Sequence, residues 1–167
     1  MLRVIKILLI LTLFFVSSCK EGRTDYHKLT NLEDVLEDPR KYEGQRLHLA
    51  GYAHYQEGLS SSLELYIDKE QAKHLDNPNI GIPPSLILLP VDGFEDSLLN
   101  CSDRVVSVYG VLFLNPSLGL ILHLEKGIKE VKGQEVGDFC YKTIDKIPEE
   151  TLQELMRFHK TAPKVGR

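Results

Sequence analysis

Two histidines lie in residues 46–55, a stretch with the pattern of a β-strand, and histidine is a common metal ligand. His48 and His54 fall on the same side of the alternation in this stretch. They are six residues apart, which is roughly 20 Å in an extended strand at about 3.3 Å per residue. One Zn²⁺ ion, which holds its ligands at about 2 Å, cannot bind both unless the strand bends sharply. We therefore expect no metal and no cofactor, and interpret both histidines as partly exposed strand residues.

Three tyrosines, Tyr52, Tyr55 and Tyr66, form the candidate binding face. Aromatic rings that are exposed on a β surface can stack on the flat faces of a ligand. Rings on half-buried strands can equally pack against their neighbours, and the sequence leaves both interpretations open.

Five stretches of the chain have the alternation or the apolar content of strands. These strands must position the histidines and tyrosines named above. They are residues 46–55, 63–67, 85–91, 104–114 and 118–124, the last continuing toward residue 131. Gly51 and Gly110 each follow an alternating apolar pair, and a glycine inside a strand often marks a bulge or a sharp bend. The fold class is therefore mostly β.

Two helices are predicted beside the strands. Thr30-Asn31-Leu32-Glu33 matches a capping box and predicts a short N-terminal helix that ends at Asp38, before Pro39. Pro148 opens a C-terminal helix over about residues 148–160. One face of that helix, which we expect to dock on the sheet, carries Leu152, Leu155, Met156 and His159.

The charge balance disfavours a nucleic-acid partner. The chain has 20 basic and 24 acidic residues, and its first 18 residues contain two of the bases and no acid. Without that segment, 18 bases against 24 acids leave a net charge of −6. Proteins that bind nucleic acid usually carry a basic surplus or a clustered basic face.

Residues 1–18 have the parts of an export signal peptide. Arg3 and Lys6 are followed by an apolar run, residues 7–16, and by two serines. The run is shorter than the roughly 18–20 residues that span a bilayer, and it fits the apolar section of a secretory signal, about 7–15 residues. A buried core helix is the alternative, but the segment has basic flanks and no polar face.

Val16-Ser17-Ser18-Cys19 resembles the lipobox of bacterial lipoproteins, although Val16 stands where leucine is commonest. The resemblance implies cleavage before Cys19, palmitate and further acyl chains on that cysteine, and a tether over residues 19–30. Lys20 follows the cysteine where, in enteric-type bacteria, aspartate favours inner-membrane retention. It therefore implies an outer-membrane protein facing the periplasm, provided that the organism has two membranes.

Cys101 and Cys140 remain once Cys19 carries lipid. An even pair in an exported chain favours a disulfide. A reactive or metal-binding thiol and two unpaired buried thiols are the alternatives; the chain has no CxxC motif to support the first.

The order of the predicted elements resembles the OB-fold, in which three strands, a connecting helix or loop and a hairpin form a small five-stranded, partly open barrel. Residues 39–52, PRKYEGQRLHLAGY, are similar to the opening of OB-like domains in uncharacterised exported proteins. The resemblance covers residues 31–132 and leaves residues 133–167 as a C-terminal extension. It implies that loops 56–62 and 115–119 flank a binding face.

We expect a membrane-anchored binding or interaction module of the cell envelope, whose partner is an envelope protein or a glycan. The sequence contains no GxSxG, no HExxH and no phosphate loop, so we expect no catalytic residues and no enzyme. The alternative is an envelope enzyme, such as a degenerate OB-fold nuclease or another hydrolase. Thermonuclease-type sites pair acids with arginines, and no such motif surrounds Arg40, Arg46 or Arg104.

Overall fold

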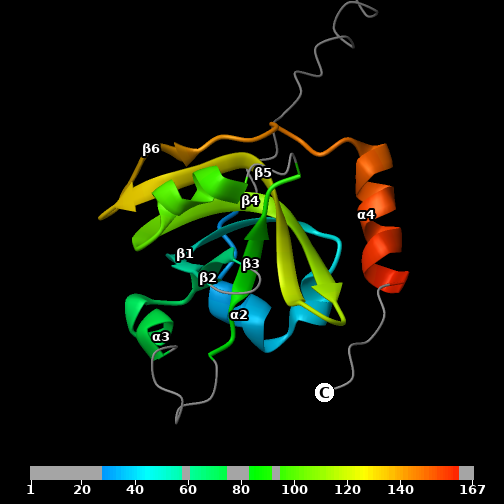
Figure 1. Cartoon of the computed structure of the whole chain (residues 1–167), viewed down its shortest axis with the longest axis horizontal. Helices are drawn as coiled ribbons and strands as arrows, with labels where there is room; N and C mark the ends of the chain where they lie inside the picture. The colour runs from blue at the N-terminus through cyan, green and yellow to red at the C-terminus, as the bar shows by residue number, and fades with distance from the viewer. Residues whose placement is uncertain (1–27, 58–60, 75–82, 92–94, 162–167) are drawn as a thin grey trace, which may run out of the picture.

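The computed structural model of the chain describes residues 28–57, 61–74, 83–91 and 95–161 (Figure 1). The predicted signal peptide, Cys19 and most of the tether lie outside these residues. The elements in order are α2 (Leu32–Glu37), η1 (Pro39–Tyr42), β1 (Arg46–Gln56), β2 (Ser62–Tyr66), α3 (Lys69–Lys73), β3 (Leu86–Leu89), η3 (Glu95–Cys101), β4 (Arg104–Asn115), β5 (Gly119–Lys132), β6 (Glu135–Tyr141) and α4 (Glu149–Thr161).

The strands form one sheet that closes on itself. Its order is β3-β2-β1-β4-β5-β6, and β3 pairs with β5 as well, so five strands make a ring and β6 extends it. The β3–β5 pairing is parallel and joins Ile87–Leu89 to Ile121–His123, whereas the other pairings are antiparallel. The mostly β fold is confirmed, with six strands in place of the five predicted.

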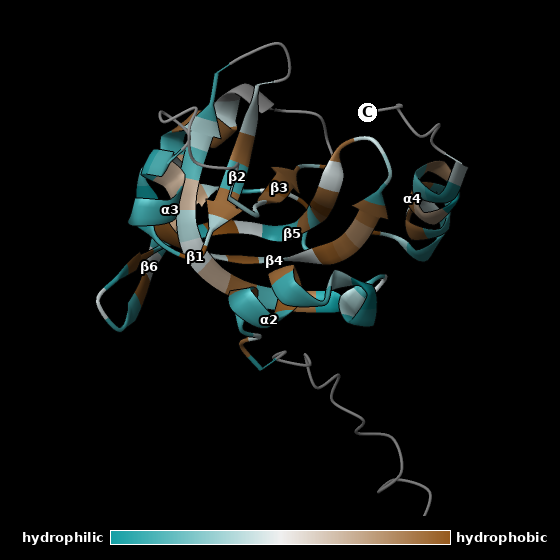
Figure 2. Cartoon of the chain, turned by 90° about the horizontal axis from the view of Figure 1, so that it is seen from below, coloured by the Kyte–Doolittle hydropathy of each residue, from teal (hydrophilic) through white to brown (hydrophobic). Residues whose placement is uncertain are grey.

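The inside of the ring is the main core, because the apolar side of each strand alternation points into it. Its members include Leu47 and Leu49 from β1, Leu63 and Leu65 from β2, Leu86 and Leu88 from β3, Val106 and Val108 from β4, and Leu122 and Leu124 from β5. Figure 2 shows apolar strand segments around the middle of the ring and hydrophilic helices outside it. Hydrophobic burial on this scale is the main force that favours the closed sheet.

Gly51 and Gly110 allow neighbouring strands to approach closely. A Cβ atom at Gly51 would lie 2.6 Å from the carbonyl oxygen of Tyr66, and one at Gly110 would collide with the carbonyl oxygen of His123. Only a residue without a side chain fits at either point. The two in-strand glycines predicted as bends are thus sites of tight strand contact.

The N-terminal helix has a different cap from the one predicted. The side chain of Asn31, not Thr30, accepts the hydrogen bond from the Glu33 N–H group. The Thr30 N–H group instead donates to the His48 carbonyl oxygen at 2.8 Å, which ties the start of the domain to β1. Thr30 is therefore already part of a β bridge and cannot serve as the first residue of the cap.

The C-terminal helix was predicted correctly. α4 lies against the outside of the β4–β5 hairpin (Figure 1) and forms a second, smaller core there. Leu152 packs in this core with Val111, Phe113 and Ile147. Of the helices in the described ranges, none combines the length and apolar character needed to cross a membrane.

Candidate functional site

The three candidate tyrosines do not form one open surface. Tyr52 and Tyr66 lie opposite each other on β1 and β2, but they are 7% and 0% exposed and pack with Ala72 of α3. Tyr55 points to the other side of β1 and packs against the main core. Burial leaves Tyr52 and Tyr66 no free ring face on which a ligand could stack.

A polar cluster satisfies the hydroxyl of the buried Tyr66. This hydroxyl donates to Glu64 Oε2 at 2.8 Å and accepts from Gln56 Nε2 at 2.9 Å. Ser85 donates to the same Glu64 oxygen at 2.5 Å. Burial, and next the hydrogen bond to Glu64, raises the pKa of Tyr66 well above its ordinary value, so the phenol stays protonated. The cluster joins β1, β2 and the start of β3.

Asp103 joins the end of β1 to the start of β4. It adopts a left-handed backbone conformation, with φ of 58°, and accepts hydrogen bonds from His54 Nδ1 at 2.8 Å and from the Tyr52 hydroxyl at 3.2 Å. The hydrogen bond from His54 is the main cause that lowers the pKa of Asp103. The neighbouring Ser102 hydroxyl also accepts a hydrogen bond from the Tyr55 N–H group. Together with the contact between His54 and Asp103, it holds the end of β1 to the start of β4.

Ser107 and His48 are the pair closest to a nucleophile and its base. Ser107 Oγ lies 2.7 Å from His48 Nε2, and the imidazole stacks on the Tyr109 ring at 4.0 Å. Ser107 is 4% exposed and lies in a strand paired on both sides, opposite Ala50 and Lys129. The backbone N–H groups around it therefore serve the sheet, and they offer no oxyanion hole to an acyl substrate.

A buried pair of histidines fixes α4 to the sheet. His123 of β5 and His159 of α4 are 4% and 3% exposed, and their Nε2 atoms are 2.8 Å apart. His159 Nδ1 lies 3.0 Å from Asn115 Nδ2, and Asn115 Oδ1 accepts from the Ser117 and Leu118 N–H groups.

These contacts determine which ring nitrogens carry hydrogen. Because Asn115 uses its oxygen for the hairpin turn, its NH₂ group must donate to His159 Nδ1. His159 then carries its hydrogen on Nε2 and donates to His123 Nε2. The hydrogen of His123 is therefore on Nδ1, a buried atom without a partner among the described residues. Burial lowers the pKa of His159, and it lowers that of His123 from 6.5 to about 4.

A buried carboxylate holds the segment that leads into α4. Glu125 is 4% exposed; its Oε1 atom accepts from the Ile147 N–H group at 2.9 Å and lies 3.2 Å from Arg46 Nε. Arg46 Nη2 also donates to the Ile147 carbonyl oxygen at 3.4 Å. This ion pair was not predicted, because its members are 79 residues apart.

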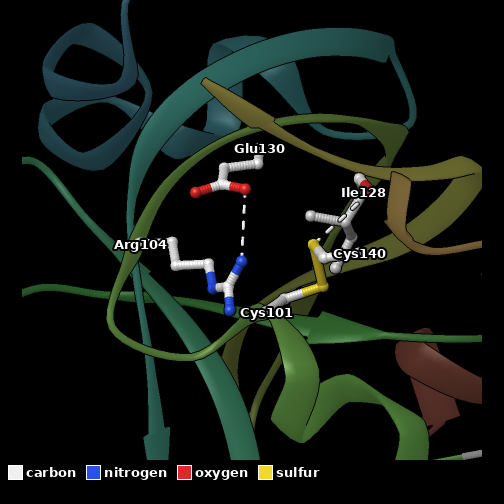
Figure 3. The surroundings of a disulfide bond; sticks show 5 residues. All are labelled: Cys101, Arg104, Ile128, Glu130 and Cys140. Atoms are coloured by element: carbon white, nitrogen blue, oxygen red, sulfur yellow. Dashed lines mark hydrogen bonds and ion pairs between the residues drawn. A yellow bond between two sulfur atoms is a disulfide. The ribbon is translucent and has the colours of Figure 1, made fainter. Parts of the chain in front are cut away.

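The two remaining cysteines form a disulfide, which confirms the prediction for this pair. Cys101 at the end of η3 and Cys140 in β6 have Cα atoms 5.3 Å apart, within the range that a disulfide requires (Figure 3). A surface ion pair between Arg104 Nη1 and Glu130 Oε2, 3.2 Å apart, lies beside it. The bond connects β6, the strand outside the ring, to the connection that precedes β4.

The predicted contact loops offer little enclosed space. A pocket beside the 56–62 loop, part of which is described, is lined mainly by Tyr55, Leu63, Leu88 and Leu98 and has a volume of about 20 Å³. Small-molecule sites usually enclose roughly 300–1,000 Å³. In the other loop, Leu118 is exposed at the hairpin tip. Across the described stretches, no three His, Cys, Asp or Glu side chains are grouped to hold a metal ion.

Comparison with known proteins does not supply a function for these features. No protein-family model matches the chain, and no curated protein matches it at a significant level.

Proposed function

We propose that this chain is a lipid-anchored protein of the bacterial cell envelope whose ring-like β domain, of the OB type, acts as a binding module. The observation that carries the proposal is the Cys101–Cys140 disulfide. Disulfides form and persist in oxidising compartments outside the cytosol, apart from specialised cases. The bond therefore agrees with the export signal inferred from residues 1–18.

The OB assignment is supported by the strand connections. Three strands, the η3 connection and the β4–β5 hairpin follow in the order of that fold, and β3 meets β5 to close the ring. In this assignment β6, α4 and the disulfide are additions after the fifth strand. They cover or extend the outside of the ring and leave its inner core unchanged.

Binding is favoured over catalysis by the partners of the titratable side chains. His54 is engaged with Asp103, His48 with Ser107, and His123 with His159. Each pair holds two elements together, and the 20 Å³ pocket beside the 56–62 loop is too small for a substrate. Exposed apolar side chains on the strands, among them Val105, Val136 and Phe139, offer an open surface that suits contact with a larger partner.

The lipid anchor is tested by replacing Cys19. We expect labelled palmitate to enter the parent protein and not the Cys19→Ala variant, because the acylated thiol is absent. The variant should also keep its signal segment and migrate as a longer chain. Gel fluorography and intact mass spectrometry measure both effects.

Lys20→Ala is the matched control, since it changes the neighbouring residue and leaves the thiol in place. It should be labelled and cleaved like the parent, although its membrane address can differ. A Cys19→Ala chain that still incorporates palmitate would show that the anchor assignment is wrong.

A further inference from the structure

One outer face of the β4–β5–β6 part of the sheet combines exposed apolar side chains with lysines. Ser107 of β4 lies opposite Lys129 of β5, and Lys129 lies opposite Phe139 of β6. Residues directly opposite in paired strands share a face. Val105, two residues before Ser107, is on this face as well.

A bulge in β6 adds a further apolar residue to this face. Val131 lies opposite Val136 and Lys129 opposite Phe139, so between these pairs one residue of β5 corresponds to two of β6. The extra residue places both Val136 and Phe139 on the side of Lys129. Val105, Val136 and Phe139 are 47%, 56% and 39% exposed. We call Val105, Lys129, Val131, Val136, Phe139 and Lys142 the interfacial face.

Among the described residues, no acidic side chain forms an ion pair with the lysines of this face. Lys129 Nζ lies 4.6 Å and Lys142 Nζ 5.5 Å from the centre of the Phe139 ring. Neither lysine belongs to an ion pair in the part of the chain that the structure describes. Of the nearby acids, Glu130 is paired with Arg104 and Lys132, Glu135 lies opposite Lys132, and Asp138 lies in the bulged segment.

We propose that the interfacial face rests on the anionic surface of the membrane that holds the lipid anchor. Apolar side chains flanked by lysines suit the headgroup boundary, where the apolar groups enter and the ammonium groups remain with the anionic lipids. The six residues of the face include two lysines and no acid, whereas the chain without residues 1–18 has a net charge of −6, so this face suits an anionic surface. Figure 2 shows the β5–β6 hairpin projecting from the ring, where it can approach a flat surface.

The length of the tether agrees with this contact, which rests on the proposed lipidation of Cys19. Nine residue steps separate Cys19 from Lys28, and they span at most about 30 Å. The domain begins beside β1, where Thr30 meets His48, and β6 is three strands away along the sheet. Three strand spacings of about 4.8 Å amount to roughly 15 Å, so the tether is long enough.

A single fluorescent reporter tests the contact, because the chain contains no tryptophan. The lipidated Phe139→Trp protein is reconstituted in vesicles of phosphatidylglycerol with phosphatidylcholine, and in phosphatidylcholine alone. We expect a blue-shifted emission that brominated lipids quench in the anionic vesicles only. Phe158→Trp, at an exposed position of α4, is the matched control and should show neither effect. Val136→Trp is a second reporter on the same face.

Lysine variants test the charge. Adding Lys129→Gln or Lys142→Gln to the reporter should lower the ratio of docked to undocked protein by about fivefold each, and high salt should act in the same direction. Emission that is the same in both vesicle types, or that shifts only when envelope proteins or glycans are added, would overturn the lipid assignment. Palmitate labelling of the same preparation reports the anchor separately. A labelled protein without a shift contradicts the interfacial face alone, and a shift without label contradicts the anchor alone.

Discussion

The double variant Cys101→Ser, Cys140→Ser is expected to unfold with a free energy about 4 kcal/mol lower than that of the oxidised parent. The two cysteines are 39 residues apart, so their bond removes much of the conformational freedom of the unfolded chain. For a domain of this size, the loss corresponds to a Tm lower by roughly 10–15 °C. Urea unfolding followed by circular dichroism measures the free energy, and calorimetry measures Tm.

The parent reduced with dithiothreitol is the control for this variant. It should unfold at nearly the same urea concentration, since both proteins lack the same cross-link. Equal stability of the oxidised and reduced parent would contradict the expected role of the bond. Two free thiols in protein isolated from the envelope would contradict the proposed compartment as well.

The strands of the ring could be predicted from the sequence, because burial on one side of a strand tends to leave a period of two in the apolar residues. Alternation and apolar content located β1, β2, β4 and β5, and a short apolar run located β3. Closure of the sheet was inferred from the two in-strand glycines and from the resemblance to the OB-fold. The disulfide followed from the even number of cysteines that remain if the chain is exported and Cys19 carries lipid, an argument that needs no geometry. The C-terminal helix followed from Pro148 and the apolar face that begins at Leu152.

The sixth strand was missed because it lacks that signal. β6 is exposed from Glu135 to Phe139, it contains Gly137 and Asp138, and its pairing with β5 is shifted by irregularities. An edge strand held by backbone hydrogen bonds and by one disulfide does not need alternating apolar side chains. The interfacial face was missed for the same reason, since the bulge and not the sequence period places Val136 beside Phe139.

The tyrosines show a limit of reasoning from strand alternation. The period placed Tyr52 on the polar side of β1, as the structure does, but it gave no information on what covers that side. Tyr66 and Tyr52 are buried because the short helix α3 packs over them through Ala72. A covering element of five residues with no strong pattern of its own could not be placed on this face in advance.

The contact between His123 and His159 could not be predicted either, because the two residues are 36 positions apart and no local sequence pattern pairs them. Some signal existed, because His123 interrupts an apolar run and His159 shares the apolar face of α4. When both histidines are neutral, each hydrogen bond has one donor and one acceptor: Asn115 donates to His159, and His159 donates to His123. A proton added to either ring would set two donors against each other, at His159 Nδ1 or between the two Nε2 atoms.

Acid is therefore expected to weaken the docking of α4. The pKa of His123 is lowered from 6.5 to about 4 in the folded protein, mainly by burial, so the unfolded chain binds more protons between these values. The free energy of unfolding accordingly falls as the pH falls from 6.5 toward about 4. The nearby carboxylate of Glu43 acts on His159 in the opposite direction, but burial outweighs it.

The variant His123→Gln tests this expectation, because an amide oxygen can accept the hydrogen bond from His159 Nε2 but does not titrate. Between about pH 7.5 and about pH 4.5, the parent should lose about 2–3 kcal/mol more of its free energy of unfolding than this variant does. The difference between the two proteins removes the contribution of carboxylates that both contain. His74→Gln, at the exposed end of α3, is the matched control and should follow the parent. Parallel pH profiles for the parent and His123→Gln would show that the buried pair does not govern the acid response.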